Sequence, residues 1–313
     1  MTGRGWVFGL LAAAALAACD GGSGSDAGTG TDAATPNLPP IEIYEESAMS
    51  YVATGGSLGC FGTRTAPVGG APVDVRFELR DFQDGFEVVG AEVWLFGDNV
   101  IADDCTGGCQ RLTTDAMGNA AARLPAGGWY AYRVLPLEGP TARTTVFGVF
   151  QYNKPTPASA GGAVDGNSVS GSTIELIPAL LGITREPGRA IVAGRVHDCV
   201  DTNNVRNVQI RIYDPDGNYI EPGTRPNDPR YHYFMGLVRG NVPDQTAEHT
   251  AADGLYVAPQ VPLVDDRPYR VEAWANFDGA YQRYGCETAR LYADSVTILN
   301  IGPMRADPDP ACR

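Results

Sequence analysis

The stretch VDVRFELR, from Val73 to Arg80, is the segment that decides the fold. Its apolar and charged residues alternate at every position, and successive side chains of a β-strand point to opposite faces. A helix would instead need apolar residues three and four positions apart. The segment therefore predicts a half-buried strand of an antiparallel sheet.

Further segments of the same kind lie on the C-terminal side of this strand. They are GAEVWLF at 90–96, WYAYRV at 129–134, TTVFGVFQY at 144–152 and STIELI at 172–177. The chain has 39 Gly, 23 Pro and 14 Tyr but almost no Lys, a composition typical of turn-rich β-structure. No stretch beyond the first twenty residues has a clear helical period. The sequence therefore predicts an all-β protein.

The second half of the chain repeats the first. Residues 90–96 match NVQIRIY at 207–213, and residues 114–134 match 250–271. In each copy a Thr precedes a turn glycine, an apolar-Pro pair follows, and Tyr-Arg-Val ends the next strand. Internal repetition of this kind indicates two domains. The predicted segments are a first β-sandwich at 41–182, a connector within 177–188, a second β-sandwich at 187–305 and a C-terminal tail at 306–313.

These motifs resemble those of carboxypeptidase regulatory-like domains, which are Ig-like, transthyretin-like β-sandwiches. The family pattern is a Gly-Ala-x-Val strand, a T-x-x-x-G turn, a Pro-Gly turn and a Y-x-V strand. Leu124-Pro125-Ala126-Gly127 fits the Pro-Gly element. The resemblance implies two tandem antiparallel sandwiches that serve as non-catalytic accessories, without peptidase activity.

The N-terminus is typical of an export signal followed by a tether. An apolar run from Trp6 to Ala15, too short to span a bilayer, leads to Leu16-Ala17-Ala18-Cys19. These four residues resemble the lipobox of bacterial lipoproteins, in which the cysteine is lipidated. We predict a signal peptide at 1–18, lipidation of Cys19, and a flexible linker over 19–40, whose composition cannot bury enough surface to order itself. The alternative is a signal peptide with an incidental cysteine.

Charge restricts the partners of the protein. The net charge is −14, which would repel both phosphate backbones and an anionic membrane surface. We therefore predict no nucleic-acid partner, and attachment to the membrane through a lipid rather than through charge. The expected location is the bacterial cell envelope, at the inner or the outer membrane and facing the periplasm or the surface.

Six cysteines remain after Cys19, and an exported chain reaches an oxidising compartment. Two lie within the predicted second sandwich, two close a short CTGGC loop, and the last two would clip the tail to the first sandwich. An alternative pairs Cys60 with one cysteine of the loop and leaves Cys312 free. The predicted pairs are Cys199–Cys286, Cys105–Cys109 and Cys60–Cys312.

An insertion in the second copy, Glu221 to Asp244, is the candidate binding loop. It makes that copy about twenty residues longer, and long loops on a rigid sandwich often carry binding. Its aromatic and arginine side chains suit a glycan or a protein partner of the envelope. The alternative is that the aromatic residues only cover a sheet face. The candidate residues are Arg230, Tyr231, His232, Tyr233, Phe234 and Arg239.

One catalytic alternative depends on the tyrosines that flank His232. Intradiol ring-cleaving dioxygenases have a related sandwich and bind ferric iron with two Tyr and two His, and residues 250–271 distantly resemble their strand-turn pattern. The family's His-x-His is replaced here by Tyr269-Arg270-Val271. We therefore predict no catalytic residue, metal or cofactor, and a non-catalytic envelope lipoprotein that presents a binding surface or acts as a spacer.

Overall fold

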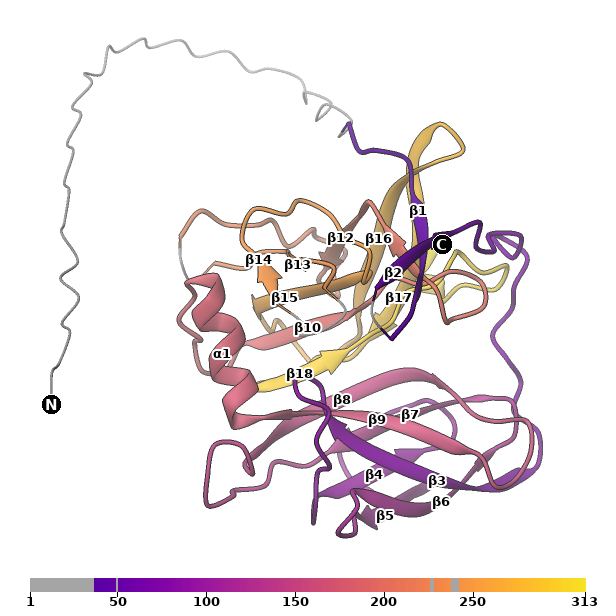
Figure 1. The fold of residues 1–313 in the computed structure, drawn as a ribbon, viewed down its shortest axis with the longest axis vertical. Helices are drawn as coiled ribbons and strands as arrows, with labels where there is room; N and C mark the ends of the chain where they lie inside the picture. Colours follow the sequence, from indigo (N-terminus) through magenta and orange to yellow (C-terminus); the bar gives the residue numbers. More distant parts are fainter. Residues whose placement is uncertain (1–36, 49, 226–227, 238–241) are drawn as a thin grey trace, which may run out of the picture. The chain divides into compact units, whose positions relative to one another are not determined.

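The computed structural model describes residues 37–48, 50–225, 228–237 and 242–313. Residues 36–313 form one compact unit, and the described part is almost entirely β-structure (Figure 1), so the predicted all-β fold is confirmed. The predicted signal peptide, Cys19 and most of the predicted tether lie outside the described residues. The elements are β1 (Glu42–Glu46), β2 (Tyr51–Thr54), β3 (Pro72–Asp81), β4 (Glu92–Phe96), β5 (Cys109–Thr113), β6 (Asn119–Pro125), β7 (Trp129–Val134), β8 (Val146–Pro155), β9 (Ala163–Ser170), α1 (Gly171–Leu181), β10 (Ala190–Arg195), β11 (Asn204–Arg206), β12 (Val208–Tyr213), β13 (His232–Phe234), β14 (Pro243–Asp244), β15 (Leu255–Val261), β16 (Tyr269–Phe277), β17 (Ala280–Ala289), β18 (Ser295–Ile298) and the 3₁₀ turn η1 (Pro310–Cys312).

A central sheet runs through both copies of the repeat. Its strand order is β14-β13-β15-β10-β18-β8-β7-β4-β5, and β9, β3 and β6 continue it from β8. The junction is β18, which comes from the second copy and pairs in parallel with β8 of the first, from Ser295–Gly148 to Ile298–Gln151. The two copies are therefore joined by main-chain hydrogen bonds. Two smaller sheets have the orders β12-β16-β17 and β11-β1-β2.

Most strands of the central sheet have buried side chains on both of their faces. On β4, Val93 and Leu95 belong to one hydrophobic cluster, and Trp94 and Phe96 belong to another. The first cluster, here called the first-copy core, also includes side chains of β3, β6 and β9. The other, the second-copy core, includes side chains of β12, β16 and β17. The second-copy core thus lies between the central sheet and the separate sheet β12-β16-β17, and the first-copy core lies between two parts of the central sheet, with β3, β6 and β9 opposite β4, β7 and β8.

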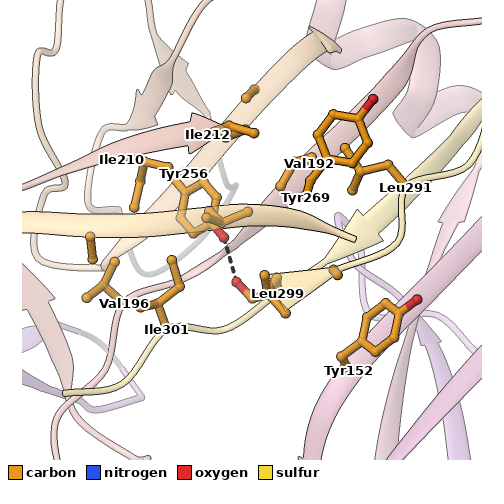
Figure 2. Packing of buried hydrophobic residues seen from close by; sticks show 14 of the residues in the cluster. Tyr152, Val192, Val196, Ile210, Ile212, Tyr256, Tyr269, Leu291, Leu299 and Ile301 are labelled. Carbon is orange, nitrogen blue, oxygen red and sulfur yellow. Dashed lines mark hydrogen bonds between the residues drawn. The ribbon is translucent and has the colours of Figure 1, made fainter. Parts of the chain in front are cut away.

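The second-copy core contains buried tyrosines whose hydroxyl groups bond to the main chain. In Figure 2 the Tyr256 hydroxyl donates to the Leu299 carbonyl, 2.6 Å away. Tyr256 is 1% exposed, so this bond satisfies a polar group that would otherwise be costly to bury. The bond also ties β15 to the chain just after β18, on the second-copy side of the junction.

The sequence repeat appears in the structure as two equivalent threonine contacts. The Thr114 hydroxyl accepts from the Ala91 amide (3.0 Å) and donates to the Val88 carbonyl (2.6 Å). In the second copy, the Thr250 hydroxyl makes the same two bonds, with the amide of Val208 and the carbonyl of Val205. The turn glycines that follow, Gly118 and Gly254, have φ of 69° and 65°, a conformation that favours glycine.

The helix α1 replaces the strand predicted at 172–177, and that prediction was wrong. The side chain of Ser170 caps its first turn, and Gly182 ends it with φ of 67°. Three apolar residues that line one cavity, Ile174, Ile177 and Leu181, recur at helical spacing. The short apolar run fits either type of element, and only these two caps distinguish a helix from a strand.

The N-terminal hairpin packs on the second copy, although the sequence places residue 41 onward in the first. Strand β1 pairs with β11, where Tyr44 lies opposite Asn204. The Asn276 side-chain amide donates to the Leu38 carbonyl (3.0 Å). The segment from Leu38 to Glu46 therefore crosses over and pairs with the repeat copy that is later in sequence, and β2 pairs with β1.

Three disulfides join the six described cysteines, and one of them, Cys105–Cys109, is a predicted pair. The predicted pairs Cys199–Cys286 and Cys60–Cys312 are wrong. The crossing N-terminal segment brings Cys60 to Cys199, with their Cα atoms 5.8 Å apart. The C-terminal 3₁₀ turn folds against β17, within its own copy, and pairs Cys312 with Cys286.

Candidate functional site

The tyrosines of the predicted binding loop are part of the fold. The Tyr233 hydroxyl accepts from the Ile210 amide (2.9 Å), and the Tyr231 hydroxyl donates to the Ile220 carbonyl (2.6 Å). Burial raises the pKa of both hydroxyl groups far above the usual value. Strand β12 is at the edge of its sheet, and the two hydroxyls accept from its Ile210 and Ile212 amides (2.9 and 3.3 Å), which lack a neighbouring strand. They are not free to bind a ligand.

The other candidate residues that the structure describes, Arg230, His232 and Phe234, do not form a shared site with the tyrosines. Side chains alternate along β13, so His232 and Phe234 face away from Tyr233, and Phe234 packs in the first-copy core. His232 is 6% exposed; burial and the nearby Arg230 lower its pKa to about 4. Arg230 donates to a main-chain carbonyl within its own loop (3.0 Å), and Arg239 lies outside the described residues.

The ferric-iron alternative needs these tyrosines and His232 to converge on one ion. They do not converge, because Tyr233 and His232 lie on opposite faces of β13 and both tyrosine hydroxyls bond to the main chain. Among the described residues, no group of three or more His, Cys, Asp or Glu is placed to hold a metal ion.

We expect Tyr233→Phe to lower the free energy of unfolding by about 1–3 kcal/mol, because it leaves the buried Ile210 amide without an acceptor. Urea denaturation would measure the change. The matched control is Tyr44→Phe, whose hydroxyl bonds to Glu42 in an exposed position and whose loss should cost less than about 0.5 kcal/mol. Equal effects of the two variants would contradict the structural role of Tyr233.

A cavity of about 280 Å³ lies where the two copies meet, beside α1, and we call it the seam cavity. Its floor is the face of β15, β10 and β18 that points away from the second-copy core, and α1 lies beside the ends of β10 and β18 (Figure 1). The outer face of a sandwich is normally polar, but here it is apolar. The apolar lining residues are Phe82, Val169, Ile174, Ile177, Pro178, Leu181, Ile191, Ala193, Phe234, Leu255, Val257, Pro259, Val296 and Ile298.

The polar residues of the seam cavity include two cations. Lys154 is the single lysine of the chain and is 8% exposed; its Nζ lies 2.5 Å from Asp165 Oδ2. Desolvation raises the pKa of Asp165, but the charge of Lys154 and its hydrogen bond outweigh this and lower the pKa overall. Arg195 donates to the Asp201 carbonyl (3.1 Å) and forms no ion pair with a described residue. Two cations and one carboxylate give this group a net positive charge, in a protein that carries −14.

Sequence reasoning missed the seam cavity, although one signal pointed to its floor. The run AIVAG at 190–194 is continuously apolar rather than alternating. Such a run is typical of a strand buried on both faces, and β10 is such a strand, paired in parallel with β18. This run could have indicated a strand that is buried on both faces, but it could not have indicated the cavity beside α1.

A second hollow, of about 190 Å³, shares Lys154 and Arg195 with the seam cavity and also contains Glu287. The Asn153 side-chain amide donates to Glu287 Oε2 (3.0 Å), and Arg305 lies 3.5 Å from the same oxygen. Burial raises the pKa of Glu287 to about 7, against the opposing effects of Arg305 and Asn153. This carboxyl group therefore titrates near neutral pH.

The fold and its covalent links define a disulfide-linked β-sandwich protein. No family model matches the chain, and no curated protein matches it. The solved structures that it matches include the TIE protein of Bacillus anthracis, at 11% identity over 74% of this chain and 34% of that one, with a TM-score of 0.22. They also include the shaft pilin SpaA of Lactobacillus rhamnosus GG (14% identity, 74% and 98% covered, TM-score 0.21) and the major pilin subunit BcpA of Bacillus cereus (7%, 74% and 99%, 0.22).

The chain spans about a third of the TIE protein. At these identities and TM-scores, the comparisons assign neither a family nor an activity to this chain. In the described part of the chain, no helix is both long enough and apolar enough to cross a bilayer.

Proposed function

We propose that the protein is a lipid-anchored component of a bacterial cell envelope, and that its β-sandwich body is a non-catalytic binding module or spacer. The observation that carries the proposal is that all six cysteines after Cys19 are in disulfides. Disulfides persist outside the cytosol, where thiols are not kept reduced. Export and the lipobox-like Leu16–Cys19 stretch together suggest an anchor at residue 19.

The construction of the body supports a role in presentation. One sheet runs through both copies, and most of its strands are buried on both faces, so the two copies would move as one piece. The predicted tether before it would hold this piece away from the membrane. As a binding module it would take a glycan or another envelope protein as its partner.

Cys19→Ser tests the anchor. We expect the wild-type protein to incorporate labelled fatty acid in its native host and to partition into the detergent phase of a Triton X-114 extract, because two or three acyl chains hold a protein firmly. The Cys19→Ser variant should lose both properties. The control is the Cys105→Ser, Cys109→Ser double variant, which should keep both. A Cys19→Ser variant that keeps the label would refute lipidation at this residue.

A further inference from the structure

We propose that the seam cavity binds a single-chain amphiphile with an anionic head group, such as a fatty acid. The chain would lie against the apolar floor beside α1, and the carboxylate would lie at Arg195 and Lys154. This inference does not depend on the lipid anchor, because the cavity is formed entirely by the compact unit at 36–313.

The apolar part of the ligand follows from the lining. The strands of the floor contribute Ile191, Val257 and Val296, which are only 5–7% exposed and yet border open space. From the other side, α1 contributes Ile174 and Ile177. Apolar atoms that line a cavity lack packing partners on one side. An aliphatic chain would supply these contacts.

The size of the cavity favours one chain over two. Small-molecule sites range from roughly 300 to 1,000 Å³, and the seam cavity, at about 280 Å³, lies at the lower limit. A two-chain phospholipid would have to leave most of its apolar surface outside. A single saturated chain of medium length matches the available space.

The charge of the head group follows from the cations. Asp165 pairs with Lys154, whereas Arg195 forms no ion pair with a described residue and donates to the Asp201 carbonyl. A partly buried guanidinium without a carboxylate partner can bind the carboxylate of a ligand strongly, because charge-assisted hydrogen bonds to Arg are roughly twice as strong as neutral ones. Asn167 and Asn300 also line the cavity and could donate to the same oxygens.

The test compares dodecanoate with dodecan-1-ol, which has the same chain length but no charge. Binding is measured by isothermal titration calorimetry on the full chain carrying Cys19→Ser, so that no detergent competes. We expect saturable binding of one dodecanoate per chain, with dodecan-1-ol binding about tenfold more weakly. Arg195→Met should weaken the binding of dodecanoate by about the same factor and leave the affinity for dodecan-1-ol unchanged.

A matched pair of variants on α1 locates the site. Ile177→Trp fills the cavity and should weaken dodecanoate binding more than tenfold, whereas Leu176→Trp, at a neighbouring position that is 43% exposed, should leave it within about twofold. If Ile177→Trp does not fold, Ala193→Leu on the floor replaces it. Absence of saturable binding, or equal effects of the two tryptophans, would overturn the site. Equal affinity for the acid and the alcohol would overturn the anionic head group.

Discussion

Removal of the Cys60–Cys199 disulfide is expected to lower the free energy of unfolding by about 5 kcal/mol, the largest effect of any change proposed for this protein. The two cysteines are 139 residues apart, and a cross-link that closes so long a loop removes much entropy from the unfolded chain. Guanidinium denaturation of the Cys60→Ala, Cys199→Ala double variant, monitored by tryptophan fluorescence, measures the loss.

The short disulfide provides the control. Cys105 and Cys109 are four residues apart, and the same entropy relation gives about 2 kcal/mol for their loop. The Cys105→Ala, Cys109→Ala variant should therefore be clearly more stable than the Cys60→Ala, Cys199→Ala variant. Arg64 and Asp201 form a paired hydrogen bond (2.8 and 2.7 Å) beside the long disulfide and would still hold the crossing segment. Equal losses in the two variants would mean that chain entropy does not account for the effect of the long disulfide.

Glu287→Gln is expected to stabilise the protein at pH 8 by up to about 3 kcal/mol. The pKa of Glu287 is raised from 4.5 to about 7. Between these values the folded state holds a proton that the unfolded state has released, so the free energy of unfolding falls as pH rises through this window. The stabilisation that the proton on Glu287 contributes to the free energy of unfolding is complete below pH 4.5 and is lost above pH 7. A glutamine remains neutral and keeps an acceptor for Asn153.

Urea denaturation from pH 4.5 to 8 measures the free energy of unfolding of the wild type and of Glu287→Gln. The difference between the two values gives the effect of Glu287 alone. His232 acts in the opposite direction, because its pKa is lowered from 6.5 to about 4 and its contribution is lost as pH falls through that range. This second contribution cancels in the difference, since both proteins have the histidine. A difference that does not change with pH would show that Glu287 is ionised in the folded protein throughout.

The two faces of the predicted binding loop illustrate the limit of reasoning from residue types. Tyr231, His232 and Tyr233 are candidates by sequence, because aromatic and basic side chains in a long loop suit a ligand. In the structure the tyrosine hydroxyls bond to the main chain around β12, and His232 is buried on the other face. Composition alone does not distinguish an aromatic side chain that binds a ligand from one that supports an edge strand.

The sequence by itself determined the β-class of the chain and its internal repeat. The alternation in Val73–Arg80 and the matched threonine-glycine turns at Thr114 and Thr250 are local features, and the strands and turns that they indicate are present. The Cys105–Cys109 disulfide could also be predicted from the sequence, because the two cysteines are close together in the chain. Each of these features depends on interactions between near neighbours in sequence.

Only the tertiary structure decided how the two copies are joined. The parallel pairing of β18 with β8, the crossing of residues 38–46 to the second copy, and the Cys60–Cys199 link all connect segments more than a hundred residues apart. The seam cavity depends on the same contacts, because its floor, its cations and its helix come from both copies. Hydrophobic burial has no directional preference for one partner over another, so a sequence pattern shows that a face will be buried but not which element covers it.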